Sequence, residues 1–232
     1  MIFIINPNAN QIVSKTLKDL GHKVIPSLSF DTSVLTHPDQ QIHPLDDRTA
    51  ITAPEYYPYY RQHLPESIHL LQGNTSLSGT YPSDCAYNVA RVGQSVFCNT
   101  RTVDSVLYRY YQQKGYQIFH VNQGYTKCNI VPVGEDCILT EDIGIHNIII
   151  ANQLNIQSIF LPVGEVALAG FPYGFIGGSC GGGKNQLFWY GNPEEYSYFS
   201  KIKIETEKRG IENIALSSGP LWDWGGIICF PL

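Results

Sequence analysis

Tyr87–Gly93, which reads Tyr-Asn-Val-Ala-Arg-Val-Gly, is repeated further along the chain by Cys128–Gly134, which reads Cys-Asn-Ile-Val-Pro-Val-Gly. The same pattern recurs upstream at Ile42–Leu45 and downstream at Gly178–Cys180. Spacings of roughly 40 to 50 residues are typical of repeat architectures, in which each repeat is one supersecondary unit. We therefore interpret the chain as copies of a single unit.

Each copy carries the same succession of elements: a first strand, a second strand, a helical segment and a third strand. The clearest helix is predicted over Val103–Lys114, where apolar residues recur at helical spacing. Helices are also expected over Ile143–Leu154 and Glu194–Arg209. In the first copy the corresponding segment is Glu55–Leu64, and Pro58 makes it a poor helix.

The two ends of the chain together supply a fifth copy. Met1–Asn6 reads as a second strand, Asn10–Leu20 as a helix and Lys23–Leu28 as a third strand. The missing first strand is Gly225–Cys229, which repeats the Gly-Gly pattern of Gly177–Cys180. We predict one α/β domain over residues 1–232, a five-bladed α/β propeller of ββαβ repeats, closed by pairing of the N- and C-terminal strands. The five repeats are expected at residues 39–73, 84–122, 125–163, 175–218, and 223–232 together with 1–28.

Composition and charge exclude several classes of protein. Charged residues are only 15% and the net charge is −5, so the basic stripe of a nucleic-acid-binding protein is missing. The apolar runs are shorter than the roughly 20 residues that span a bilayer, and the first residues lack the features of a signal peptide. Six cysteines without a C-x-x-C spacing indicate neither a zinc site nor a redox motif. We expect a cytoplasmic protein without metal, cofactor, nucleic-acid or membrane partner; no feature indicates an oligomeric state.

Polar residues recur at two positions of the repeat alignment. Strand alternation predicts that both positions face the propeller axis, where carboxylates would suit a planar guanidinium. The alternative is that the acids are turn residues, because prolines precede two of them closely. We predict that a small cationic ligand of the guanidino type binds in the axial cavity to Asp39, Asp84, Asp223, Asn88 and Asn129, with His43 at the same position as the two amides.

Five ββαβ repeats that end in Gly-Gly-x-x-Cys at Gly225–Cys229 resemble the pentein, or guanidino-group-modifying, superfamily. It includes arginine and agmatine deiminases, dimethylarginine hydrolases and amidinotransferases. His37–Asp39 and Tyr173–Gly178 are similar to a bacterial branch of it. The resemblance implies a covalent mechanism, in which a cysteine thiolate attacks the guanidinium carbon, acids hold the nitrogens and a histidine transfers protons. It implies Cys229 as the nucleophile and Asp84 as a guanidinium-binding acid.

The chain departs from this superfamily at the histidine. Its enzymes carry one in the segment that enters the fourth copy, which here is Val166–Pro172 and contains none. His43 is the candidate replacement, and Lys127 is a weaker one. Two functions therefore stay open: a binding protein for a guanidino-type cation, or a hydrolase, deiminase or amidinotransferase that acts through Cys229. Cys229 also has a plainer interpretation, as a small residue of the core.

Overall fold

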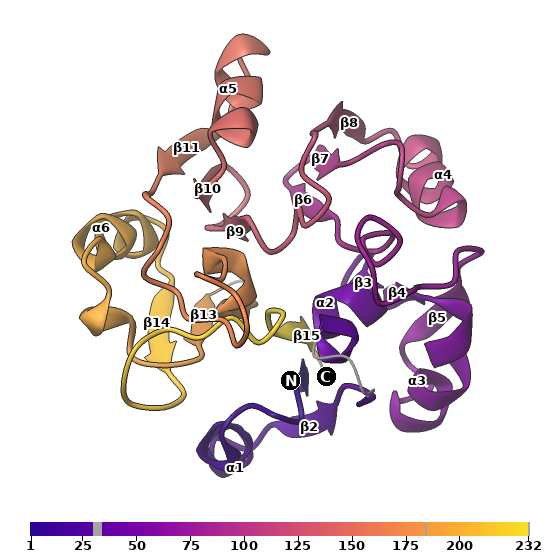
Figure 1. Cartoon of the computed structure of the whole chain (residues 1–232), viewed down its shortest axis with the longest axis horizontal. Coiled ribbons are helices and arrows are strands. Elements are labelled where there is room, and N and C mark those ends of the chain that lie inside the picture. The colour runs from indigo at the N-terminus through magenta and orange to yellow at the C-terminus, as the bar shows by residue number, and fades with distance from the viewer. Residues whose placement is uncertain (30–33, 184, 232) are drawn as a thin grey trace.

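The computed structural model describes residues 1–29, 34–183 and 185–231, and its strands form five separate three-stranded sheets. In every sheet the central strand pairs antiparallel with one neighbour and parallel with the other. Figure 1 shows the five units arranged around a common centre. The units contain β3 (Ile42–Pro44), β4 (Thr49–Thr52) and β5 (His69–Gln72); β6 (Ala90–Val92), β7 (Ser95–Cys98) and β8 (Gln117–His120); β9 (Ile130–Pro132), β10 (Cys137–Thr140) and β11 (Gln157–Phe160); β12 (Cys180–Gly182), β13 (Gln186–Trp189) and β14 (Glu212–Ala215); and β15 (Ile228–Phe230), β1 (Ile2–Ile5) and β2 (Lys23–Pro26).

Five helices connect the central strand of each unit to the strand parallel to it, as such a crossover requires. They lie on the outside of the molecule (Figure 1). None of the helices in the described ranges is long and apolar enough to cross a membrane. The helices are α1 (Gln11–Asp19), α3 (Tyr57–His63), α4 (Ser105–Gln113), α5 (Ile143–Ala151) and α6 (Phe199–Lys208), and shorter turns are α2 (Pro38–Gln41), η1 (Val34–Thr36), η2 (Pro54–Tyr56), η3 (Ile176–Gly178) and η4 (Pro193–Glu195).

Two helix predictions need correction. The first copy does contain a helix, because Pro58 lies in the first turn of α3, where its missing N–H and fixed φ are tolerated. In the fourth copy, α6 begins at Phe199 rather than at Glu194. The residues before it form the separate turn η4, which the side chain of Asn192 caps. The helix predicted over Glu194–Arg209 therefore corresponds to two separate elements, η4 and α6.

The two ends of the chain meet in one sheet, as the repeats predicted. β15 runs antiparallel to β1, with Ile2 opposite Phe230 and Ile4 opposite Ile228. All four side chains are buried in one hydrophobic core, together with side chains of the first two units. Both ends of the chain consequently lie next to each other near the centre of the molecule (Figure 1).

The acids at the first of the two repeat positions lie in the interior, but for a different reason from the one predicted. Strand alternation does not orient the three acids, because Asp39 lies in α2, Asp84 in a turn and Asp223 in an irregular segment before β15. The turn interpretation fits the local conformation of Asp84, which lies in a turn, but not that of Asp39 in the helix α2. All three carboxylates are nevertheless at most 2% exposed. The segments that precede the first strands of these units thus place their acids in the interior.

Candidate functional site

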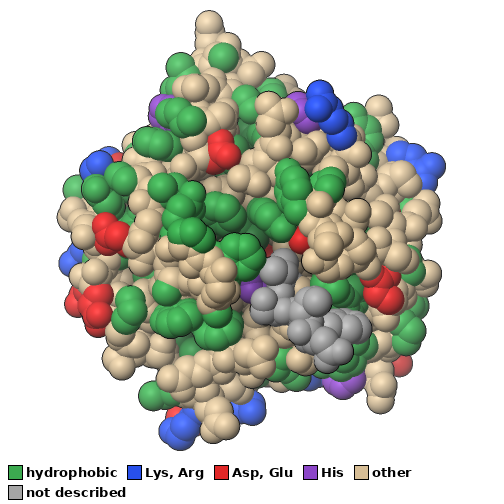
Figure 2. Space-filling view, in the orientation of Figure 1, with side chains coloured by type: hydrophobic (Ala, Val, Ile, Leu, Met, Phe, Trp, Pro, Cys, Tyr) green, Lys and Arg blue, Asp and Glu red, His purple; other side chains and the backbone are tan. Residues whose placement is uncertain are grey.

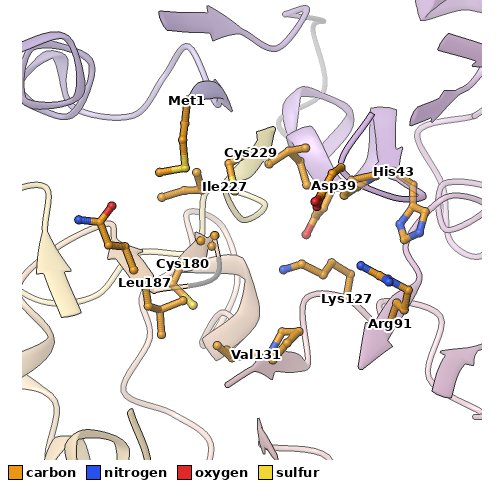
Figure 3. Close-up of a pocket in the computed structure, with 18 of the residues that line it drawn as sticks. Met1, Asp39, His43, Arg91, Lys127, Val131, Cys180, Leu187, Ile227 and Cys229 are labelled. Carbon is orange, nitrogen blue, oxygen red and sulfur yellow. The ribbon is translucent and has the colours of Figure 1, made fainter. Parts of the chain in front are cut away.

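A cavity of about 840 Å³ lies where the five units meet, and residues from every unit line it. Figure 3 shows side chains from several units pointing into it. Four residues that the sequence singled out line this cavity together: Asp39, His43, Lys127 and Cys229. The hairpin turns Asp46–Asp47 and Gly134–Glu135 also contribute to its wall. Residues predicted for the site that do not line it are Asp84, Asp223, Asn88 and Asn129.

Asp39 is a buried carboxylate with unused hydrogen-bonding capacity. Its Oδ2 accepts a bond of 3.0 Å from the Cys128 thiol, whereas its Oδ1 has no hydrogen-bond partner among the described residues. Burial raises the pKa of Asp39 to about 6, although the charges of His37 and Lys127 act in the opposite direction. Asp39 therefore carries a negative charge at neutral pH, and its Oδ1 retains an unused capacity to accept hydrogen bonds.

The carboxylates of Asp84 and Asp223 already accept hydrogen bonds from other groups of the protein. Asp223 accepts hydrogen bonds of 2.9 Å from the backbone N–H groups of Phe175 and Gly225. Asp84 Oδ2 accepts one of 2.8 Å from the hydroxyl of Tyr125. These bonds tie the two acids to neighbouring segments of the chain, and neither acid lines the cavity. In the structure they support the turns between units, and only Asp39 reaches the cavity.

The Gly-Gly pair near the C-terminus permits a close approach of the chain to His37. Gly225 has a φ of +80°, and a Cβ there would lie 2.2 Å from the Cβ of His37. The ring of His37 in turn lies 3.9 Å from Asp223, Nδ1 to Oδ1. The glycine that the sequence presented as part of a family motif has a structural role here, because it lets His37 pack against the acid.

The side chains of the two predicted amides, Asn88 and Asn129, form hydrogen bonds with backbone groups. Asn88 Oδ1 accepts hydrogen bonds from the backbone N–H groups of Lys127, at 2.7 Å, and Cys128, at 3.3 Å. Its Nδ2 donates to the carbonyl of Asp39 at 3.4 Å. Asn129 donates to the carbonyl of Tyr125, four residues earlier. Asn88 therefore joins three units and fixes the positions of Asp39 and Lys127.

His43 is held in a neutral hydrogen-bonded pair. Its Nε2 lies 2.7 Å from the hydroxyl oxygen of Tyr111. Burial lowers the pKa of His43 to about 3, and the positive charges of Arg91 and Lys127 add to the effect. The imidazole is uncharged at neutral pH, so in this structure it supplies no positive charge to a cysteine.

Cys229 lies in β15 opposite Phe3 and is partly buried. Burial raises the pKa of its thiol to about 12, while the charge of Lys127 acts in the opposite direction. The side chain also packs against the core formed by Phe3 and its neighbours. Cys229 is therefore a thiol at neutral pH, on the border between core and cavity.

Two basic residues, Arg91 and Lys127, line the cavity, and the sequence analysis did not identify them as main site residues. Lys127 donates to the carbonyl of Gly177 at 3.2 Å, and Arg91 donates to the hydroxyl of Tyr116 at 3.2 Å. Lys127 was named only as a weaker base, and Arg91 was missed. The sequence does contain an indication of Arg91: it is a charged residue between two apolar ones in the strand Ala90–Val92. Strand alternation turns its side chain to the face opposite to that of its two neighbours. Among the described residues, no group of three or more potential ligands could hold a metal ion.

The raised pKa of Asp39 predicts how its removal changes stability. In the unfolded chain this carboxyl ionises near pH 3.8, and in the folded protein near pH 6. The unfolded state therefore releases its proton first, so ionisation of Asp39 lowers stability as the pH rises from about 4 to 6. Asp39→Asn should stabilise the ligand-free protein relative to wild type, by about 2 kcal/mol more at pH 7.5 than at pH 4.5. Urea unfolding at the two pH values measures this difference.

Asp46 at the cavity rim offers a control of opposite sign. Hydrogen bonds from Tyr110 and the backbone of Arg48 hold the pKa of its carboxyl below the usual value, against the effect of burial. Asp46→Asn should therefore cost stability at neutral pH, and this cost should shrink as the pH falls through the range in which Asp46 is protonated. If Asp39→Asn behaves like Asp46→Asn, then burial does not dominate at Asp39.

Five ββαβ units around a central cavity give the chain a pentein-like fold, and comparison with solved structures agrees. DDAH from Pseudomonas aeruginosa, a cysteine-to-serine mutant in complex with citrulline, superimposes with a TM-score of 0.56 at 9% identity, over 94% of this chain and 92% of that one. The amidinotransferase SxtG of the saxitoxin pathway of Microseira wollei gives a TM-score of 0.54 at 10% identity, over 93% and 88% of the chains. At these identities the likeness shows the fold. The chain belongs to the family described as "Family of unknown function (DUF6873)", whose model matches residues 4–228. No curated protein matches the sequence.

Proposed function

We propose that this pentein binds a small cationic ligand of the guanidino type in its axial cavity and holds it without turning it over. The observation that carries the proposal is the buried Oδ1 of Asp39, which has no hydrogen-bond partner among the described residues. A buried carboxylate oxygen without a partner is costly, and a guanidinium N–H in the cavity would satisfy it. The charge of Asp223 also acts at Asp39 and adds negative potential there.

The rest of the cavity supports binding more than turnover. Cys229 is protonated at neutral pH, because its pKa is raised to about 12 by burial. His43 is neutral and bonded to Tyr111. A second candidate function, cysteine-dependent hydrolysis, deimination or amidino transfer, is favoured by one observation, namely that Cys229 shares the cavity with Asp39. We further propose that the five units close into a propeller and that the protein works in the reducing cytoplasm, where its six free cysteines persist.

The binding proposal is tested by thermal stabilisation. Methylguanidine and agmatine should raise the melting temperature. Acetate at the same concentration should not raise it, because the carboxylate of Asp39 does not bind an anion. A ligand at about 100 times its Kd adds about 2.7 kcal/mol of stability. For a chain of this size that corresponds to roughly 5–10 °C.

Variants and pH identify the residue that binds the cation. The stabilisation should disappear in Asp39→Asn and persist in Glu135→Gln, because Glu135 is an exposed acid of the same cavity. It should also weaken below about pH 6 in the wild-type protein, as Asp39 becomes protonated. Equal stabilisation of wild type and Asp39→Asn by the guanidino compounds would refute the proposal.

A further inference from the structure

The carboxylate of Asp39 is held by a cysteine from another unit. Cys128 lies in the turn before β9 of the third unit, and its sulfur is 3.0 Å from Oδ2 of Asp39 in α2. Oδ1 of the same carboxylate has no hydrogen-bond partner among the described residues. Cys128 is 3% exposed and Asp39 is 1% exposed. The protein therefore binds one oxygen of this buried acid and leaves the other without a partner.

Asn88 determines the direction in which the proton of this thiol points. Its Oδ1 accepts hydrogen bonds from the backbone N–H groups of Lys127 and Cys128, which identifies that atom as the amide oxygen. Its Nδ2 lies 3.3 Å from the sulfur of Cys128 and can only donate to it. The sulfur accepts this bond, so its own S–H group donates to Asp39. A chain of hydrogen bonds thus runs from Asn88 of the second unit through Cys128 to Asp39 of the first.

The thiol of Cys128 keeps its proton at neutral pH. Burial raises its pKa well above the usual value, and the charges of Asp39 and Asp223 raise it further. Cys128 is consequently a permanent donor to Oδ2. At Asp39 burial is the largest influence and raises the pKa to about 6, while the hydrogen bond from Cys128 acts to lower it.

Other charged and titratable groups surround Asp39, but they act on it without a hydrogen bond to its carboxylate. Within the described ranges, the thiol of Cys128 is the one group that forms such a bond. Figure 2 shows that the Lys and Arg side chains of the face drawn there lie towards its periphery, away from the centre of the molecule. The groups that exchange electrostatic effects with Asp39 are His37, Lys127, Asp223, Cys85 and Tyr190.

We infer that Cys128 is a positioning residue of the cation site: its thiol fixes Oδ2 of Asp39 and thereby leaves Oδ1 for the guanidinium of the ligand. The inference rests on the proposed function and adds the residue that orients its acid. The terminal torsion of an aspartate is broad, so an unheld carboxylate samples many orientations. A single directed donor selects one of them before the ligand arrives, which reduces the ordering cost of binding.

The test titrates the carboxyl group of Asp39 in the ligand-free protein by carbon-13 NMR, with Asp39→Asn to assign its signal. Cys128→Ala removes a hydrogen bond to the ionised form, so the midpoint should rise from about 6 to about 6.5–7. Cys128→Ser retains a donor and should stay near the wild-type midpoint. Cys85→Ala is the matched control, because the Cys85 thiol donates to a different acid, Asp84, at 3.2 Å. It should leave the midpoint of Asp39 unchanged.

Binding of methylguanidine at about pH 8 separates the orientation of Asp39 from its charge. Asp39 is ionised at that pH in wild type and in both Cys128 variants, so a loss of charge no longer contributes. Cys128→Ala should still bind methylguanidine about 3- to 10-fold more weakly, as the loss of one hydrogen bond predicts, and Cys128→Ser should not. If wild type does not bind methylguanidine at all, the proposed function fails, whereas the titration of Asp39 still decides whether Cys128 holds its carboxylate.

Infrared spectroscopy of the thiol gives a measurement that leaves Cys128 in place. A hydrogen bond strengthens when its acceptor becomes charged. The S–H stretching band should therefore move to lower frequency as the pH of the wild-type protein rises through about 6, and this change should be missing in Asp39→Asn. A midpoint of Asp39 that is unchanged in Cys128→Ala, or that moves equally in Cys85→Ala, would overturn the inference. If Cys128→Ala does not fold, an S–H band that is independent of pH in wild type would overturn it instead.

Discussion

Deletion of residues 225–232 should prevent the protein from folding into its native state. The deletion removes β15 and with it the antiparallel ladder on β1. It also removes the buried side chains of Ile227, Ile228 and Phe230, each at most 2% exposed. Burial of an aliphatic or aromatic side chain contributes about 1.5–3 kcal/mol. The loss of three approaches the whole stability of a typical domain, about 5–15 kcal/mol.

The loss extends beyond the terminal strand. The carbonyl of Gly225 accepts a hydrogen bond from the backbone of Asp39, and Gly225 N–H binds Asp223, so the deleted segment also anchors the first unit. Deletion of residues 231–232 alone is the control, because Pro231 is exposed and β15 remains. Circular dichroism and melting curves of the two proteins measure the effect. A soluble protein that lacks residues 225–232 and melts like wild type would contradict the role of the terminal strand in holding the ends together.

The repeats predicted the arrangement of the chain because the period reports a whole supersecondary unit. Asn10–Leu20 was predicted as a helix and Gly225–Cys229 as a strand beside the N-terminus, and both follow from repeat position rather than from local propensity. The predictions failed where one residue had to be placed within a turn. Pro58 was interpreted as a helix breaker, although proline in a first turn is well tolerated.

The site was harder to predict than the fold, since it depends on which groups satisfy one another in three dimensions. Asp84 and Asp39 share a repeat position, yet the hydroxyl of Tyr125 occupies the first while one oxygen of the second is free of partners in the described structure. Repeat alignment treats the two as equivalent. Lys127 was underestimated for a related reason, because its long side chain reaches the carbonyl of Gly177 in the next unit, which no sequence spacing indicates.

Cys229 should react with alkylating reagents no faster than a cysteine of the core. With a pKa of about 12, its thiolate population at pH 7 is roughly 3,000-fold below that of a free cysteine. The higher intrinsic reactivity of a basic thiolate recovers about half of this on a logarithmic scale, so labelling should be slower by roughly 50-fold even without steric protection. Cys98 is the internal control, because burial also raises its pKa to about 12.

A comparison of two reagents then distinguishes binding from catalysis at this cysteine. Iodoacetamide is neutral, whereas a haloacetamidine carries an amidinium cation that Asp39 would attract into the cavity. If the protein only binds its ligand, mass-spectrometric mapping should find Cys229 and Cys98 labelled at similar slow rates by iodoacetamide, and the haloacetamidine should gain at Cys229 only what its enrichment in the cavity provides, because a bound cation does not by itself deprotonate the thiol. If Cys229 is a nucleophile, iodoacetamide should also label it faster than Cys98, the haloacetamidine should label it selectively, Asp39→Asn should slow that second labelling, and a guanidino compound should protect against it. Selective labelling of this kind would replace the binding function with the enzymatic alternative. Equal rates would leave Cys229 as a residue that packs β15 against Phe3 and forms part of the cavity wall.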